Sequence, residues 1–381
     1  MDNVYVLGTG MTSFGKFSDR TAIDLGSESL LAALDHAAIN VADVDAVYAS
    51  HVYGGMVAGQ RVAASCGLAG LPTLNVENAC ASGTSAVIEA VYAIRSGRYS
   101  CVAVVGFEQV STVKGMLQPA EDDLEGQLGL VFPAWYAMRA RLYMEKYGMS
   151  RDQLSLVAVK NHHHGSLNPL AQYRNEITVG AVAESREIAT PLRLLDCCPK
   201  GDGGAAVILG SEDRLRGLRD DRRPVAIRGC GLSSGAPDGE YPGLFEDITS
   251  RAAKHAYDEA GISPQDVDFA EVHDCFSIAE GLRVEGLGLC DPGRYFHELS
   301  DEGRWMLDGT TPINPSGGLL AKGHPLGATG VAQLHEITTQ LQGLANERQV
   351  GKADVAVAHT RGGSVPGTEG GSCAVLVCEG A

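Results

Sequence analysis

Short runs of small and β-branched apolar residues recur along the chain, and stretches with helical periodicity separate them. Runs of this kind are typical of strands that are buried on both faces of a sheet. The clearest runs lie at residues 101–106, 204–209, 354–359 and 373–377. Because buried strands alternate with helices, the pattern predicts an α/β fold in which helices cover the sheets.

The pattern is repeated within the chain. Residues 4–10 (VYVLGTG) resemble residues 225–231 (VAIRGCG), and residues 38–47 resemble residues 261–270. The two offsets, 221 and 223 residues, nearly agree. An internal repeat of this length predicts two similar halves stacked on each other.

The first half is longer, and the excess lies between two core strands. We expect residues 1–110 and 191–222 to form the N-terminal half and residues 223–381 the C-terminal half. Residues 111–190 are then an insertion. Long insertions between core strands are usually functional, so we expect this one to form a cap over the site.

Composition and charge narrow the class of protein. The 381 residues are 44% apolar and 20% charged, which is typical of a soluble globular protein. A net charge of −17 argues against a nucleic-acid-binding surface, which needs basic residues. There is no signal peptide, no apolar run long enough to span a membrane, and no C-x-x-C pair among ten cysteines. We therefore expect a cytoplasmic protein with reduced cysteines and no metal site.

Cys80 is the first candidate for chemistry. It lies among small residues in NACASGTSA, between an extended segment and the helical stretch 86–94. The positive end of a helix dipole favours a thiolate, which is the form that attacks carbonyl groups. A buried turn of small residues is the alternative interpretation, since a free cysteine is often simply part of a core.

The internal repeat supplies a partner for this thiol. It aligns Cys80 with His324 and Gly83 with Gly327, so both candidates begin equivalent helices. If the halves pack about a pseudo-twofold axis, the two helix starts face each other. A thiol beside an imidazole is the activated pair that covalent catalysis needs. A helix-capping role is the alternative for His324.

A second group ends the strand at 267–272. His273 can donate a hydrogen bond to an enolate oxygen, and Cys275 can act as an acid or base if its pKa falls toward neutrality. An ordinary strand end with a buried thiol is the alternative. The run 162–164 (HHH) has no carboxylate at helical spacing, and we expect a solvated helix face there rather than a metal site.

These motifs together resemble the thiolase superfamily, in particular its sterol-carrier-protein-2-type, or lipid-transfer-protein-like, branch. The resemblance extends over essentially the whole chain. It rests on CAS at 80–82, DCCP at 196–199, HDCF at 273–276, NPSGG at 314–318 and GHP at 323–325. It implies a duplicated fold of two βαβαβαββ halves, packed as a five-layered α/β/α/β/α core.

The resemblance also implies a chemistry. Cys80 would be the acylated nucleophile, His324 its base, and His273 with a water the group that stabilises a thioester enolate. The backbone N–H groups of Cys80 and Gly362 would hold the tetrahedral oxyanion. The substrate would be a β-ketoacyl-CoA, with coenzyme A as co-substrate and no tightly bound cofactor.

The chain departs from the wider superfamily near its C-terminus. Many thiolases carry a Cys-x-Gly there, whereas this chain has Thr360-Arg361-Gly362, so proton transfer at the substrate α-carbon is expected to fall to Cys275. The loop 363–371 is longer than usual. Arg361 is expected to point outward; the alternative is that it binds a carboxylate on the substrate.

Two other functions remain open at this stage. One is a retro-aldolase acting on β-hydroxyacyl-CoA side chains, because some relatives in this branch have that activity. The other is a non-catalytic acyl-CoA-binding subunit. The resemblance further implies a homodimer and a small zinc-containing OB-fold (DUF35-type) partner.

Overall fold

The computed structural model describes residues 3–115, 124–217, 222–237 and 247–381. Its strands are β1 (Val4–Met11), β2 (Ala46–Ser50), β3 (Thr73–Val76), β4 (Cys101–Gln109), β5 (Glu187–Ala189), β6 (Leu192–Arg193), β7 (Asp202–Ser211), β8 (Val225–Ser234), β9 (Phe269–Glu271), β10 (Val355–Gly362) and β11 (Ser372–Gly380). Its α-helices are α1 (Ala22–Ala37), α2 (Ala58–Ser65), α3 (Ser82–Arg95), α4 (Leu124–Gln127), α5 (Phe132–Tyr147), α6 (Arg151–Ser166), α7 (Val179–Glu184), α8 (Asp247–Ala260), α9 (Ser277–Gly286), α10 (Tyr295–Asp301) and α11 (Leu326–Leu341). None of these helices is long and apolar enough to cross a membrane.

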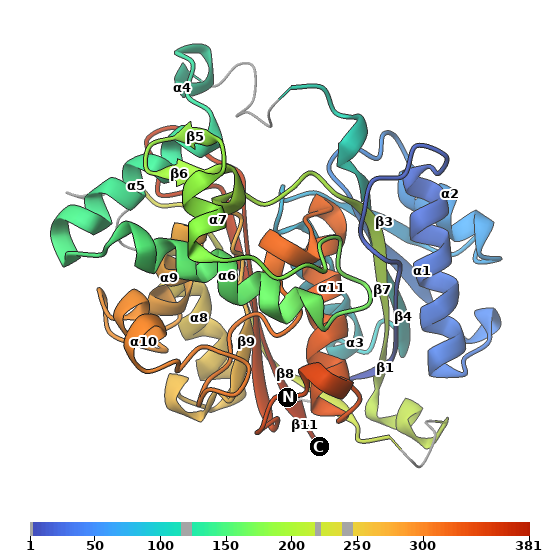
Figure 1. Cartoon of the computed structure of the whole chain (residues 1–381). Coiled ribbons are helices and arrows are strands. Elements are labelled where there is room, and N and C mark those ends of the chain that lie inside the picture. The colour runs from blue at the N-terminus through green and yellow to red at the C-terminus, as the bar shows by residue number, and fades with distance from the viewer. Residues whose placement is uncertain (1–2, 116–123, 218–221, 238–246) are drawn as a thin grey trace.

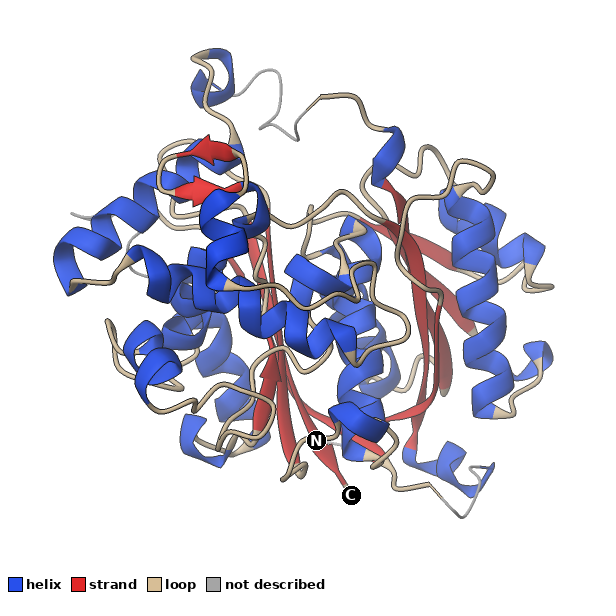
Figure 2. Cartoon of the chain, in the orientation of Figure 1, coloured by secondary structure: helices blue, strands red, loops and turns tan. Residues whose placement is uncertain are grey.

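The elements form five layers, as expected (Figures 1 and 2). Helices α1 and α2 cover the outer face of strands β3-β2-β4-β7-β1, and α8 packs on the outer face of β8 and β11. Helices α3 and α11 lie between the two sets of strands and contact both. Both central helices are buried along most of their length because a sheet covers them on either side.

A single pair of strands joins the halves. Strands β1 and β8 pair antiparallel, with Val4 opposite Ile227, Tyr5 opposite Ala226 and Val6 opposite Val225. The repeat aligns Tyr5 with Ala226, so these equivalent residues face each other. A strand that pairs with its own equivalent in this way marks a local twofold axis. The internal duplication predicted from the sequence is therefore present as a pseudo-twofold in the fold.

The halves differ at their third strand. In the first half β3 pairs with β2 over four residues, from Val47–Thr73 to Ser50–Val76. In the second half the equivalent position has one parallel bridge, between Ala270 and Ile313. The chain between β9 and α11 instead forms α9, α10 and the segment that leads to His324.

Helix α6, inside the insertion, corrects one expectation. His162 and His164 are 5% and 0% exposed, so the run 162–164 is not a solvated face. His164 Nδ1 lies 3.0 Å from the carbonyl oxygen of Asn314, and His162 Nδ1 lies 3.1 Å from that of Asn175. Only His163 reaches the surface, beside Glu176. The run is buried because α6 packs against α9 and the segment before α11.

Candidate active site

One cavity of about 290 Å³ contains every candidate residue. Its wall combines both halves and the insertion, since Phe132, Trp135 and Tyr136 of α5 line one side. The remaining wall includes the candidates from the sequence, which are Cys80, His273, Cys275, His324, Arg361 and Gly362. Side chains of the insertion thus form part of the cavity wall.

The thiol and the two imidazoles meet at the seam between the halves. Cys80 and His324 each lie two residues before a central helix, α3 and α11 respectively. A sulfur and two ring nitrogens, from Cys80, His273 and His324, all lie within 4.8 Å of one another. The two rings are 5.0 Å apart between centroids and nearly perpendicular. The pairing that the repeat alignment predicted is therefore present.

Thr329 sets the tautomer of His324. The Thr329 hydroxyl donates to the carbonyl oxygen of Pro325 at 2.9 Å, which uses its only hydrogen. Its oxygen must then accept from His324 Nδ1, 2.8 Å away. Consequently Nδ1 carries the ring hydrogen and Nε2 keeps a lone pair. Nε2 is buried and has no hydrogen-bond partner among the described residues, which is the state of a base awaiting a proton.

The protonation state of Cys80 differs from the sequence-based expectation. Burial, and after it the neighbouring thiol of Cys275, raises the pKa of Cys80 well above its ordinary value. Burial, and next Lys322, lowers the pKa of His324 to about 3. Both groups are therefore neutral in the free protein at pH 7. The start of α3 therefore does not by itself make a thiolate of Cys80.

Burial also favours the neutral forms of Cys275 and His273. Burial raises the pKa of Cys275, so the condition set for a base role, a pKa near neutrality, is not met in the free protein. Burial, and after it the ring of His324, lowers the pKa of His273 well below its usual range. A neutral Cys275 thiol still holds a proton that it can give. Tyr136 stacks on the adjacent Phe276, with 4.6 Å between ring centroids, and closes the cavity there.

Gly362 lies against the backbone of the Cys80 loop. A Cβ atom on Gly362 would stand 2.4 Å from the carbonyl oxygen of Asn78 and 2.5 Å from the nitrogen of Cys80. Only glycine allows the end of β10 to approach the loop this closely.

Arg361 corrects a second expectation. Its side chain is 4% exposed and lines the cavity, so it does not point outward. The longer loop 363–371 covers it, because a Cβ on Gly370 would stand 2.6 Å from the guanidinium.

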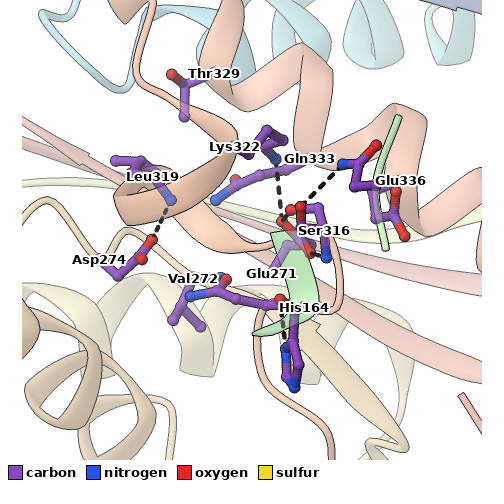
Figure 3. A network of polar contacts seen from close by, with 12 residues as sticks. His164, Glu271, Val272, Asp274, Ser316, Leu319, Lys322, Thr329, Gln333 and Glu336 are labelled. Carbon is purple, nitrogen blue, oxygen red and sulfur yellow. Dashed lines mark hydrogen bonds and ion pairs between the residues drawn. The ribbon is translucent and has the colours of Figure 1, made fainter. Parts of the chain in front are cut away.

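A buried polar network beneath the cavity was not anticipated (Figure 3). Asp274, between His273 and Cys275, accepts hydrogen bonds from the backbone N–H of Leu319 at 2.7 Å and of Leu320 at 3.2 Å. It also accepts from Asn161 of α6 at 2.7 Å. Burial, and next the carboxylate of Glu280, raises the pKa of Asp274 to about 7. This side chain thus ties the β9 end to the turn 318–322 that leads to His324.

A second carboxylate holds the same turn. Glu271 accepts from the hydroxyl of Ser316 at 2.6 Å and pairs with Lys322 at 3.2 Å, and both donors point toward it in Figure 3. Acidic residues at the end of an apolar strand were a usable sign, but their partners lie about 45 residues further along the chain.

Glu108 is a third carboxylate that the sequence reasoning missed. It is fully buried at the end of β4. It accepts from the backbone N–H groups of Val52 and Tyr53 at 2.8 and 2.9 Å, and from that of Gly327 in α11 at 3.2 Å. Burial raises the pKa of Glu108 to about 7. It joins the first half to the start of the helix that follows His324.

Replacing Asp274 with Asn is expected to lower the free energy of unfolding by about 1–3 kcal/mol. The amide has one acceptor oxygen, so its NH₂ group faces a buried N–H that then lacks an acceptor. Denaturant titration measures the change. Asp258→Asn, at a surface position where the side chain is 64% exposed, is the control and should stay within about 0.5 kcal/mol of wild type. Equal free energies of unfolding for the two variants would show that the Asp274 hydrogen bonds do not stabilise the fold.

Comparisons with known proteins find thiolase-family matches in both halves of the chain. Residues 4–213 match the thiolase N-terminal domain family and residues 239–369 match the thiolase C-terminal domain-like family. The chain is 40% identical to an acetyl-CoA acetyltransferase of Methanothermobacter thermautotrophicus, covering 99% of both chains. It is 38% identical to sterol carrier protein 2 of Gallus gallus, covering 94% of this chain and 69% of that one.

A solved structure described as an Ltp2-ChsH2(DUF35) aldolase superposes with a TM-score of 0.86 at 26% identity. The match covers 100% of this chain and 98% of that one. Two family matches that together span most of the sequence, and a relative that is 40% identical along its full length, establish the assignment. The chain belongs to the thiolase family.

Proposed function

We propose that the protein is a thiolase that transfers an acyl group between coenzyme A and the α-carbon of an acyl-CoA through an acyl-Cys80 intermediate. One observation carries the proposal, which is the approach of the Cys80 sulfur to the His273 and His324 ring nitrogens within 4.8 Å in the wall of one cavity. A nucleophile, a base and a hydrogen-bond donor within contact distance form the set that covalent acyl transfer requires.

In the cleavage direction, the Cys80 sulfur attacks the keto carbon of a β-ketoacyl-CoA while its proton passes to His324 Nε2. The bond between the α- and β-carbons breaks, and its electron pair forms a thioester enolate beside His273. Cys275 gives the proton that converts the enolate to the first product, the acyl-CoA that contains the original α-carbon, while the shortened acyl chain stays on Cys80. The thiol of a second coenzyme A then attacks the Cys80 thioester and gives its proton to the Cys275 thiolate. The shortened acyl-CoA forms, and the departing Cys80 sulfur takes back its proton from His324 Nε2. The reverse sequence is a Claisen condensation.

The backbone N–H groups of Cys80 and Gly362 are proposed to hold the oxyanion of each tetrahedral intermediate. Their support is the close packing of Gly362 on the Cys80 loop, which places the two backbones side by side. Donors of this kind are worth about 10²–10³ in rate each.

Mass spectrometry of the intact protein and its Cys80 peptide, after exposure to a panel of acyl-CoAs, tests the proposal. We expect a covalent acyl group on Cys80 that a second coenzyme A removes. The same experiment reports which acyl group the cavity prefers. An unlabelled Cys80 with every acyl-CoA that the protein turns over would refute the acyl-enzyme mechanism.

A second candidate function is retro-aldol cleavage of a β-hydroxyacyl-CoA. The similarity to the structure described as an aldolase favours it. That reaction needs an acid and a base but no acylated thiol, so the sulfur beside His324 would have no use. Product analysis after incubation with matched β-keto and β-hydroxy thioesters separates the two reactions.

Arg361 is proposed to bind a carboxylate on the acyl part of the substrate, because its charge is buried in the cavity wall. Arg361→Ala should lower kcat/KM for a carboxylated β-ketoacyl-CoA ten- to a hundredfold more than for a neutral one, about the worth of a charged hydrogen bond. Arg361→Lys, which keeps the charge but not the fork geometry, is the matched variant. Equal losses on the two substrates exclude this role.

We propose a homodimer because the sheet ends in an edge strand, β3, with exposed apolar side chains around it. Strand β3 is the last strand of its sheet, and Leu74 on it is 48% exposed. Met56 and Val57, next to the helix that packs on β3, are 90% and 58% exposed. An unpaired edge flanked by apolar side chains favours association with a second copy. Light scattering should give twice the chain mass, and a monomer contradicts the proposal.

A small zinc-containing OB-fold subunit of the DUF35 type is proposed as a further partner. The support is the similar solved structure, which is described as an Ltp2-ChsH2(DUF35) aldolase. Copurification of this chain from its native host, followed by identification of any bound protein, is the direct test.

A further inference from the structure

The catalytic candidates also form a potential metal site. A thiol and two imidazoles are zinc ligands of the same kind as in catalytic zinc centres, where three protein side chains leave one position open. In a tetrahedral site with metal–ligand distances of about 2.0–2.3 Å, ligand atoms lie about 3.3–3.8 Å apart. The atoms from Cys80, His273 and His324 lie within 4.8 Å of one another. The three side chains would have to close in by up to about 1 Å for an ion to bind all of them.

A buried ring nitrogen without a partner in the described part of the chain, His324 Nε2, lies at this place. His273 and His324 are 2% and 4% exposed, and His273 Nδ1 and His324 Nε2 have no hydrogen-bond partner among the described residues. Thr329 holds the hydrogen of His324 on Nδ1, so Nε2 offers a lone pair and not a hydrogen. Metal-bound histidines are held by such a bond on their other nitrogen. The orienting contact of a metal ligand is therefore already present.

The ligand types select the metal. Sulfur and imidazole nitrogen favour Zn²⁺ and Co²⁺ over Mg²⁺ and Ca²⁺, which take oxygen ligands. Among the described residues, this is the one group of three histidine, cysteine or acidic side chains whose ligand atoms come this close. The cavity beside it leaves room for a water in the fourth position.

We propose that Cys80, His273 and His324 form a reversible binding site for Zn²⁺ or a similar thiophilic divalent cation, and that the bound ion blocks acyl transfer. On binding, the Cys80 S–H bond breaks, the sulfur–metal bond forms and the proton passes to the solvent. The ion then coordinates both the Cys80 sulfur and His324 Nε2. Neither the electron pair of the nucleophile nor the lone pair of its base is free to react. The blocking part rests on the function proposed above, whereas the binding part does not.

Co²⁺ serves as the spectroscopic probe for the site. Addition of Co²⁺ to the wild-type protein should give a thiolate-to-cobalt charge-transfer band and the visible absorption of a tetrahedral ion, saturating at one ion per chain. Zn²⁺ should displace it, and calorimetry should give the Zn²⁺ stoichiometry directly. Cys80→Ala should remove the charge-transfer band, and His273→Ala or His324→Ala should each weaken Zn²⁺ binding at least tenfold.

Two control variants address binding elsewhere. Cys290→Ser removes a half-buried thiol and His163→Ala a surface imidazole, and neither residue lines the cavity. Both should bind Co²⁺ as wild type does. Circular dichroism checks that every variant is folded, and Cys80→Ser, nearly the size of the native side chain, replaces Cys80→Ala if the latter is not. Absence of the charge-transfer band, or equal Zn²⁺ binding by wild type and Cys80→Ala, overturns the site.

Turnover assays test the blocking part. Zn²⁺ should inhibit acyl-CoA cleavage, a chelator should restore it, and prior acylation of Cys80 should prevent Co²⁺ binding. Unchanged turnover with the site saturated overturns inhibition. The outcomes distinguish the two proposals, because a Co²⁺ band on a protein that never acylates Cys80 refutes the thiolase mechanism alone. A protein that acylates Cys80 during turnover, but whose unacylated form binds no Co²⁺, refutes the metal site alone.

Discussion

Replacing Cys80 with Ala is expected to abolish acyl transfer, lowering kcat for cleavage of a β-ketoacyl-CoA by about 10⁴-fold or more. Loss of the nucleophile in a covalent mechanism typically costs about 10⁶, and the remaining activity comes from binding and oxyanion contacts. Cys275, another thiol of the cavity, comes from the other half and is expected to transfer protons rather than to replace Cys80 as nucleophile. Steady-state cleavage assays measure the loss of kcat, and mass spectrometry of the peptide that contains position 80 measures the loss of the acyl-enzyme.

Two further variants make this result specific. Cys80→Ser keeps the size of the side chain but offers a far weaker nucleophile, so it should bind acyl-CoA with little turnover. Cys198→Ala removes another thiol from the same cavity and should still allow acylation of Cys80. Near wild-type cleavage by Cys80→Ala means that the thiol is not the nucleophile, and an acyl group on Cys198 would assign the role elsewhere.

The arrangement of the halves and the meeting of the two candidate residues followed from one observation, the internal repeat. Aligning Cys80 with His324 places both two residues before a central helix, and the structure has them there. The pairing of β1 with β8 supplies the symmetry that brings these helix starts together. A repeat carries long-range information that hydrophobic periodicity lacks, because equivalent residues must be related by the axis between the halves.

The ionisation of the site could not be read from local sequence. A helix start contributes about 0.3–1 kcal/mol, which is less than one pKa unit. Burial can shift a pKa by up to about 3–5 units in the opposite direction. For Cys80 burial dominates, and its pKa rises. A neutral thiol beside a neutral base stays unreactive until a carbonyl carbon is present to accept the electron pair.

The supporting contacts were also outside the reach of sequence patterns. His164 meets Asn314, 150 residues further along the chain. Asp274 meets Leu319 across 45 residues, through a turn whose shape no periodicity specifies. A polar residue in an apolar segment indicates that a partner exists, since buried polar groups are hydrogen-bonded. Which partner it is depends on packing, and this is why the histidine run was wrongly placed on a solvated face.

Gly362→Ala is expected to lower kcat by about 10²–10³-fold, the second large effect. The added Cβ would stand 2.4 Å from Asn78 O, 2.5 Å from Cys80 N and 2.7 Å from Ala81 N, all backbone atoms. Contacts this short force a shift, and the pairing of Gly362 with Ser372 holds the strand end in place. The Cys80 loop therefore moves. A displacement of this kind costs both the attack geometry and the oxyanion contacts.

Gly351→Ala is the matched control for this prediction, because an added Cβ there meets no atom within 4 Å. It should leave kcat unchanged and the free energy of unfolding within about 0.5 kcal/mol of wild type. Gly362→Ala should unfold at a free energy about 1–3 kcal/mol lower, the usual cost of overpacking, yet remain folded at room temperature. A folded Gly362→Ala enzyme that acylates Cys80 at the wild-type rate shows that the loop tolerates the displacement. In that case the close approach of β10 has no part in catalysis, and the oxyanion role of Gly362 has to be abandoned.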